Sequence, residues 1–436
     1  MGTKKLTRRE LLKGVTLAVG ASVLAACTPP PTVSPDAKAT APTGQPPATS
    51  KKVTLRVGTW WDIWKPPIQW FMDSNPNIEI SYEVTPGGSD YANKMLTQIA
   101  AGDYPDTFMV PASWFQELAA KNLFMPIDEL VARDKIDMSK WMLDQYEWAG
   151  LNKKLYGFVR GAAIPMGLYY NKKLFDAAGA KYPDKSWTWK ELTEAAKQLT
   201  KQPDQWGLIG FGNYAPLWHK AVVSNGGGLF NNDETKCLLN EEPAIQAFQW
   251  MVDLVNVHKC APPPSVIKES DRTAFIAGKA AMQHYHAQWY SYKEMSVNFS
   301  VPVWHILYPG AGKVDVNFAE SHPWCISQKT KNQEQSWLWV KYITMDKKPL
   351  KYLTDDYVPG AYDVQSLMAD LPKEKRDHYQ VVFDAQKTIR PNRFGIKAAN
   401  RVQQIVNEQI DLLYLGKKSV KDAMNDAVSQ INPLLK

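Results

Sequence analysis

In the first third of the chain, short strand-like alternations and amphipathic helices follow one another, and this order constrains the fold more than any other feature. Residues 53–57 and 78–84 alternate apolar and polar side chains, which is the period of a half-buried strand. Residues 64–74 and the stretch after Ser89 have helical patterns, and residues 107–110 form a short apolar run. Strands that alternate with helices predict an α/β fold with a parallel sheet.

The same mixture continues toward the C-terminus. Residues 168–171 read as a strand, residues 188–199 as a helix, and Pro243 suits the first turn of a further helix. The last predicted helix starts at Ser419, with Asp422 three residues on as in a capping box. A chain of 436 residues is long enough for two or three domains, each with its own hydrophobic core.

The N-terminus reads as an export signal. A basic cluster precedes an apolar run over residues 15–26, which is too short to span a bilayer. The run ends in Leu24-Ala25-Ala26-Cys27, which resembles the lipobox of bacterial lipoproteins. We therefore expect residues 1–26 to be a lipoprotein signal peptide and Cys27 to carry a lipid; an ordinary secretory signal is the alternative. Arg8-Arg9 also resembles a twin-arginine signal, and Sec export stays open.

Residues 27–50 are rich in Pro, Thr and Ala and cannot bury apolar surface. They are predicted to be a disordered tether between the lipid and the globular part. The mature protein is then extracytoplasmic and anchored to the cell membrane.

Charge and motifs exclude several functions. The net charge is +7, and five basic residues and one acidic residue lie in the first 26, which leaves +3 for the remainder. That charge is small and dispersed, so we expect no nucleic-acid partner. No Gly-x-Ser-x-Gly elbow, His-Glu-x-x-His or Walker loop occurs. His284-x-His286 lacks a third ligand, so we predict no metal and no cofactor.

Three cysteines follow Cys27. Cys237 and Cys260 flank one predicted helix, and a disulfide between them is our first choice for an oxidising compartment. The alternative is that these two and Cys325 are all small buried apolar groups.

Tryptophan is unusually abundant, with 17 Trp against 14 Phe. An indole ring can stack on the apolar face of a pyranose while neighbouring polar groups bind its hydroxyls. Asp62 is predicted either to bind two hydroxyls or to cap the helix near Ile63. Trp60 and Trp114 are the first choices for stacking, with core filling as the alternative. The predicted ligand-binding set lies at strand ends and comprises Trp60, Trp61, Asp62, Ser113, Trp114, Asn213, Tyr214, Trp218, His286, Trp289, Ser321 and Trp324.

Several short motifs, in order, resemble those of family 1 extracellular solute-binding proteins. They include Asn75-Pro76-Asn77-Ile78, Tyr104-Pro105-Asp106, the stretch from Leu168 to Phe175 and the stretch from Phe275 to Met282. This family contains sugar-binding lipoproteins of bacterial ABC transporters similar to maltose-binding protein. Each motif alone is weak, but together they cover nearly the whole mature chain.

The resemblance implies a two-lobed periplasmic-binding-protein fold of the α/β class, with discontinuous lobes joined by hinge crossovers. It implies a monomer that captures a sugar or oligosaccharide between its lobes and delivers it to ABC permease subunits. We expect crossings near 160–165, 317–323 and 355–361. The N-terminal lobe is then 51–162 plus 320–357, and the C-terminal lobe is 163–319 plus 358–436.

Two alternatives remain. A secreted glycan-active enzyme would need a pair of carboxylates, and acidic residues are plentiful, although Asp62 is the only clear acid at a predicted strand end. The same fold could instead bind a polyamine or a glycerol phosphate. Arg160, Arg390 and Arg393 could bind a phosphate, whereas a polyamine would require several acidic side chains in the site. We favour a binding protein over an enzyme.

Overall fold

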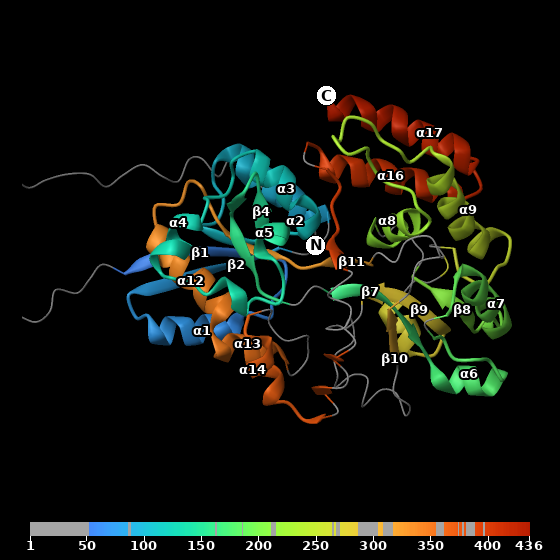
Figure 1. Ribbon diagram of the computed structural model, residues 1–436, viewed down its shortest axis with the longest axis horizontal. Helices are drawn as coiled ribbons and strands as arrows, with labels where there is room; N and C mark the ends of the chain where they lie inside the picture. The colour runs from blue at the N-terminus through green and yellow to red at the C-terminus, as the bar shows by residue number, and fades with distance from the viewer. Residues whose placement is uncertain are drawn as a thin grey trace, which may run out of the picture. The chain divides into compact units, whose positions relative to one another are not determined.

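The first sheet joins strands from distant parts of the sequence (Figure 1). Its order is β2-β1-β3-β12-β6. β1 (Val53–Thr59) runs parallel to β2 (Ile78–Val84) and to β3 (Thr107–Met109). β12 (Pro323–Ile326) lies antiparallel between β3 and β6 (Gly157–Val159). The parallel α/β sheet predicted from residues 53–110 is therefore confirmed, with one antiparallel strand added.

The computed structural model describes residues 52–436 apart from 86–88, 162–163, 185, 211–214, 264–265, 267–270, 287–303, 308–316, 355–361, 374, 377–378, 381–388 and 396. The predictions for residues 1–50, including the signal peptide, Cys27 and the linker, lie outside the described residues. Across the described ranges, no helix is both long and apolar enough to cross a membrane.

Helices from distant parts of the chain pack on the first sheet. α1 (Lys65–Ser74) lies beside α12 (Gln333–Met345), and the rings of Phe71 and Trp339 are 5.3 Å apart. This lobe also contains α2 (Ser89–Ala101), α3 (Ala112–Ala120), α4 (Asp128–Arg133), a 3₁₀ turn at Met138–Lys140, α5 (Gln145–Ala149), the hairpin β4 (Gly150–Leu151) and β5 (Lys154–Leu155), α13 (Lys347–Thr354) and α14 (Val364–Ala369).

The second sheet has the order β13-β11-β7-β9-β8, with β10 also paired to β7. β7 runs antiparallel to β9, β10 and β11, whereas β8 is parallel to β9. The strands are β7 (Ile164–Tyr170), β8 (Trp206–Ile209), β9 (Ala280–His286), β10 (Trp304–Leu307), β11 (Asn317–Glu320) and β13 (Ile389–Pro391).

The core of the second lobe combines the middle and the end of the chain. Trp218, Phe248, Ile405 and Met424 belong to one buried cluster. The helices of this lobe are α6 (Lys172–Ala178), α7 (Trp189–Leu199), α8 (Ala215–Ser224), α9 (Glu242–Asn256), α10 (Asp271–Ile276), α16 (Ala399–Tyr414), α17 (Val420–Ile431) and the 3₁₀ turn at Asn432–Leu435.

Local sequence signals determine where several helices begin. Thr188 and Glu191 form a capping box at the start of α7. The Ser419 hydroxyl accepts a hydrogen bond from the Asp422 N–H at 3.1 Å, so the predicted cap of α17 is confirmed. Pro243 lies in the first turn of α9, as predicted.

Among the described residues, two stretches connect the two sheets. The first follows β6 at Arg160, and the second is Ser321-His322 between β11 and β12, so both fall within the ranges expected for crossings. Residues 355–361, where a third crossing was expected, lie outside the described residues, but the residues that follow them differ from the prediction. Tyr362 still forms a bridge with Trp141 in the first lobe, and the Asp363 N–H donates to the Lys140 carbonyl at 2.9 Å. The boundary expected at residue 357 is therefore too early, because local pattern does not reveal which lobe α14 packs against.

The predicted disulfide is wrong in this structure. Cys237 and Cys260 are both free and fully buried in the core of the second lobe. Burial raises the pKa of each thiol to about 11. Both behave as small apolar groups, and so does the buried Cys325.

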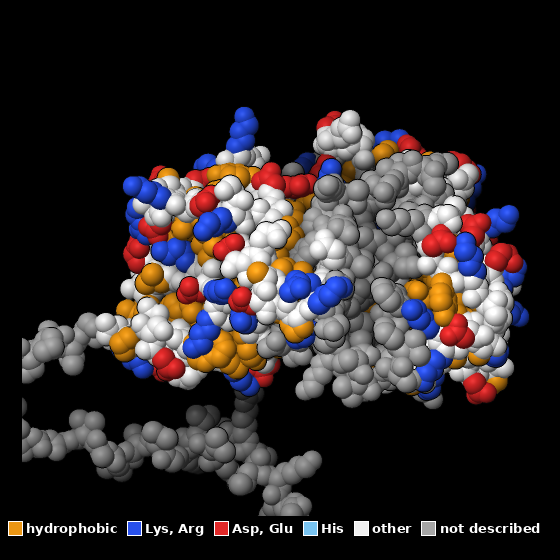
Figure 2. All heavy atoms as spheres, turned by 60° about the horizontal axis from the view of Figure 1, so that its bottom comes forward, with side chains coloured by type: hydrophobic (Ala, Val, Ile, Leu, Met, Phe, Trp, Pro, Cys, Tyr) orange, Lys and Arg blue, Asp and Glu red, His pale blue; other side chains and the backbone are white. Residues whose placement is uncertain are grey.

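Charged side chains are interspersed on the surface. On the face drawn in Figure 2, Lys and Arg side chains mix with Asp and Glu among small apolar patches. Ion pairs such as Arg133 with Glu334 (2.7 Å) illustrate this mixing. Neither sign of charge gathers over a broad area on that face.

Candidate ligand-binding site

Four strands of the first sheet end, and one begins, at the same rim. β1, β2, β3 and β6 run in one direction, and β12 runs in the opposite direction between β3 and β6. The strand register places Pro323 opposite Val159, and the Val110 N–H donates to the Pro323 carbonyl at 2.9 Å. In open α/β sheets, ligands bind beyond the carboxyl ends of strands. This rim is therefore the place to look for a site.

Four aromatic side chains meet at this rim, and we call them the aromatic rim: Trp60, Trp61, Tyr91 and His322. The Trp60 ring lies 5.0 Å from Tyr91, 4.8 Å from His322 and 5.7 Å from Trp61, each edge-on. Trp60 is only half-buried and Trp61 is 38% exposed. Apolar ring surface thus remains accessible for stacking.

Backbone groups hold two members of the aromatic rim in place. The Tyr91 hydroxyl donates to the Met109 carbonyl at 2.6 Å, and burial raises the pKa of this phenol. The Ala112 N–H donates to Nδ1 of His322 at 3.3 Å, so a neutral His322 carries its proton on Nε2. Trp60 therefore rests against two rings that are fixed to β3 and to the start of α3.

Asp62 follows the aromatic rim and is exposed. Its carboxylate accepts from the Lys65 ammonium at 2.7 Å. The N-cap of α1 is Trp64 and has no side-chain cap, so Asp62 does not take the capping role offered as its alternative. Burial and the nearby Asp62 charge raise the pKa of Tyr82, whose hydroxyl donates to the Trp61 carbonyl.

The first turn of α3 brings Ser113 and Trp114 to the same rim, both half-buried. Trp114 packs against the main clusters of both lobes. One turn on, the buried carboxylate of Glu117 accepts from the Asn400 N–H at 3.4 Å, which links α3 to α16. Part of the Trp114 surface therefore contributes to packing between lobes.

The two crossings lie next to each other. The Ser321 hydroxyl donates to the Gly161 carbonyl at 2.9 Å, and Ser321 is buried. This hydrogen bond therefore links the two crossings, and the hydroxyl does not donate to solvent. The Arg160 guanidinium lies 5.0 Å over the Trp64 ring, and burial lowers its pKa to about 9.

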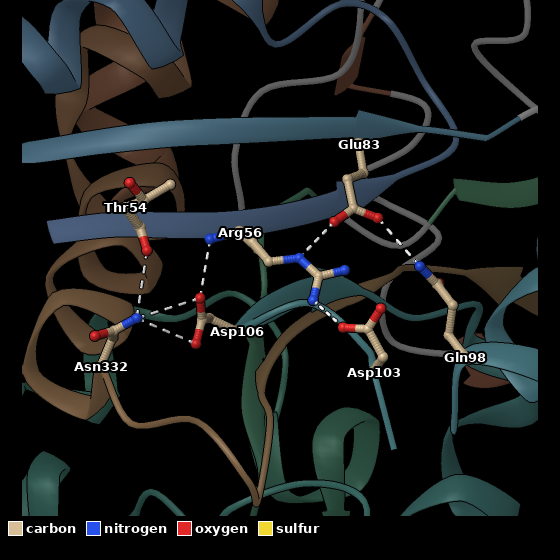
Figure 3. Close-up of polar contacts among 7 residues, drawn as sticks. All are labelled: Thr54, Arg56, Glu83, Gln98, Asp103, Asp106 and Asn332. Carbon is tan, nitrogen blue, oxygen red and sulfur yellow. Dashed lines mark hydrogen bonds and ion pairs between the residues drawn. The ribbon is translucent and has the colours of Figure 1, made fainter. Parts of the chain in front are cut away.

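A polar network joins the middle of β1 to β2 and to the segment before β3 (Figure 3). The Arg56 side chain donates to Glu83 at 2.8 Å and to Asp103 at 2.5 Å, while its backbone N–H donates to Asp106 at 2.9 Å. Asp106 also accepts from the Thr330 hydroxyl at 2.5 Å.

A pocket of about 320 Å³, including space open to solvent, adjoins this network and the aromatic rim. Its lining includes Thr59, Glu83, Tyr91 and Lys94. The pocket therefore extends the rim toward the ends of β1 and β2.

Two predicted ligand-binding residues are core residues in this structure, and neither ring is accessible to a ligand. Trp324 has no exposed surface because β12 is a central strand, not a loop, and both its faces are covered. Trp218 also has none, because it lies within helix α8, of which only Val223 is partly exposed, and its indole N–H donates to Asn407 at 3.1 Å. We exclude both from the site.

Four other predicted residues cannot be placed. Asn213, Tyr214 and Trp289 lie outside the described residues, and of His286 only the backbone, at the end of β9, is described. Of the twelve predicted residues, the rim collects Trp60, Trp61, Asp62, Ser113 and Trp114, with Ser321 buried beneath them.

Sequence reasoning missed Tyr91 and His322. Tyr91 lies inside a helix, where an apolar period predicts core packing, and only the strand order brings its ring to Trp60. His322 follows Ser321 in the predicted crossing, so its position along the chain was already a signal.

Two α/β lobes with sheets joined by several crossings define the two-lobed periplasmic-binding-protein fold. Solved structures support this: an ABC substrate-binding protein of Listeria monocytogenes, in complex with cycloalternan, has a TM-score of 0.78 at 23% identity, covering 88% of this chain and 98% of its own. Maltose-bound MalE3 of T. maritima has a TM-score of 0.74 at 18% identity, covering 88% and 100%.

The chain belongs to the family of bacterial extracellular solute-binding proteins, whose model matches residues 33–348. The maltotriose-binding protein of Pyrococcus abyssi is 24% identical over 302 residues, which is 67% of this chain and 62% of that protein. A putative binding protein of Brucella abortus is 24% identical over 379 residues, covering 84% and 88%.

Proposed function

We propose that this protein is the extracytoplasmic sugar-binding component of a bacterial ABC importer. In this proposal the ligand lies against the aromatic rim, bridges the two lobes and is handed to permease subunits. Residues 1–26 act as the signal, and Cys27 carries the lipid anchor. A ligand that bridges both lobes favours the closed form over the open one.

The observation that carries the proposal is the aromatic rim itself. Trp60 and Trp61 keep ring surface accessible at the strand ends, where the fold class binds ligands. The Asp62 carboxylate lies in the same loop and is exposed, with an ion pair to the Lys65 ammonium. Apolar ring faces beside a strong acceptor match a pyranose, which has C–H faces and a rim of hydroxyls.

Relatives point to the same substrate class. One relative is named a maltotriose-binding protein, and two solved structures of similar fold hold cycloalternan and maltose. A polyamine is less suited to this rim, because Arg160 adds a buried positive charge there. A glycan-active enzyme would need two carboxylates flanking the bond, and Asp62 is the only acid described among the rim loops.

A thermal-shift screen tests the proposal. The purified protein is melted with mono- and oligosaccharides, polyamines and glycerol phosphates, since a ligand that binds only the native state raises the melting temperature. We expect a rise with one saccharide series that is lost in Trp60→Ala. Trp70→Ala, which removes a half-buried ring of α1 that packs against Tyr352, is the matched control and should keep the rise. A rise with polyamines alone would contradict the sugar assignment, and release of products from a glycan would reopen the enzyme hypothesis.

A further inference from the structure

Arg160 is a buried cation without an acceptor. It follows β6 at the first crossing and is only 8% exposed. Its Nε and Nη2 atoms are fully covered, and neither forms a hydrogen bond. Among the described residues, no carboxylate forms an ion pair with it. A buried charge in this state is costly unless something else pairs with it.

Other arginines of the same lobe form ion pairs with acidic side chains. Arg56 donates to the carboxylates of Glu83 and Asp103 (Figure 3). Arg133 contacts Asp134 at 2.8 Å and Glu334 at 2.7 Å. The chain thus pairs arginines that have structural roles, and Arg160 differs from them.

The two unpaired atoms have a specific geometry. Nε–H and Nη2–H point from the same edge of the guanidinium and together form the fork that binds a carboxylate or a phosphate in a bidentate manner. The Trp64 ring lies over a face of the group, 5.0 Å from it, and other atoms enclose the edge that carries Nε–H and Nη2–H, so an anion reaches the fork only by displacing them. At the adjacent Gly161, no described atom lies within 4 Å of where a Cβ would be, so there is open space beside the crossing.

The local charge balance favours an anion. Asp62 follows Trp60 and Trp61 of the aromatic rim, and its carboxylate is already paired with Lys65 at 2.7 Å. Of the other described carboxylates near the rim, Glu83 pairs with Arg56 and Glu117 with Lys121, so neither neutralises Arg160.

We propose that Arg160 binds an anionic group of the ligand, and that the substrate is an acidic sugar: a uronic acid residue or a phosphorylated sugar. The Arg160 fork takes the carboxylate or phosphate oxygens while the aromatic rim stacks on the ring. This inference rests on the proposed sugar-binding function and specifies its substrate class.

The first test needs no ligand. Arg160→Met removes the unpaired charge and keeps an apolar chain over Trp64, so the melting temperature of the ligand-free protein should rise by about 2–4 °C. Arg56→Met, the matched control, removes a paired arginine and should lower it. A fall with Arg160→Met comparable to that of the control would mean that Arg160 is structural, and would overturn the inference.

The second test compares matched ligands in wild type and Arg160→Gln. Calorimetric titrations use glucuronic and galacturonic acids and their oligosaccharides, glucose and galactose phosphates, and the corresponding neutral sugars. We expect an acidic sugar to bind at least tenfold more tightly than its neutral counterpart, and Arg160→Gln to abolish that preference. Binding in the uronate arm or in the phosphate arm identifies the source of the anion.

Two outcomes contradict the inference in different ways. If a neutral sugar binds as tightly as its acidic counterpart, with unchanged affinity in Arg160→Gln, the acidic substrate is wrong and the sugar-binding function stands. If no sugar of either kind binds, the proposed function itself fails.

Discussion

Replacing Trp324 with alanine should destabilise the protein without removing a ligand contact. The side chain has no exposed surface, and its ring packs edge-on against Trp64 at 5.5 Å and Trp339 at 5.8 Å. Its indole N–H has no hydrogen-bond partner, so the loss is that of apolar packing alone. A buried Trp→Ala substitution costs about 3–5 kcal/mol. Because two edge-to-face contacts disappear as well, we expect about 4–5 kcal/mol.

Urea unfolding followed by circular dichroism measures this loss as a shift of the midpoint at constant slope. Trp324→Phe keeps a ring in the core and should cost only roughly 1–2 kcal/mol. Trp61→Ala is the exposed control and should cost less than about 1 kcal/mol. If Trp324→Ala changed the free energy of unfolding by under about 1 kcal/mol and abolished ligand binding, the assignment of Trp324 to the core would be refuted.

The other predictions concern buried polar groups and thiols. Asp106→Ala leaves the Arg56 N–H and the Thr330 hydroxyl without their acceptor and should cost about 2–3 kcal/mol in urea unfolding, whereas Asp106→Asn keeps one acceptor and should cost less. Burial lowers the pKa of His219 from 6.5 to about 4, partly offset by its hydrogen bond to Asn392 at 2.8 Å. The unfolded chain therefore binds more protons between these values, so stability present above pH 6.5 should fall by up to about 3 kcal/mol as the pH drops to about 4. His219→Gln should flatten that pH dependence, and an unchanged slope would show that His219 is not its source. Cys237 and Cys260 should each be alkylated without reductant once the protein is unfolded, and a disulfide-linked peptide in mass spectrometry would contradict their free state.

The strands and helix starts that depend on local chemistry could be predicted from the sequence. The alternation in β1, with Leu55 and Val57 buried beside the partly exposed Arg56, is visible in the residue order. The cap at Ser419 is equally local, because its acceptor and donor lie three residues apart.

Features that depend on tertiary packing were not accessible in this way. A four-residue strand that is covered on both faces resembles a loop with aromatic residues, so Trp324 was misplaced. The helix around Trp218 is buried on all sides and therefore has no polar face to reveal it. The missing acceptor of Arg160 appears only when the whole fold surrounds it, although the sequence already indicated that Arg160, with Arg390 and Arg393, could bind a phosphate.

The most direct test of the account is a calorimetric titration of the best saccharide from the screen into wild type and Trp60→Ala. We predict that Trp60→Ala raises the dissociation constant at least tenfold and lowers the unfolding midpoint less than Trp324→Ala does, because Trp60 is only half-buried at the rim. An unchanged dissociation constant would mean that the ligand does not bind at the aromatic rim, and would contradict the central claim.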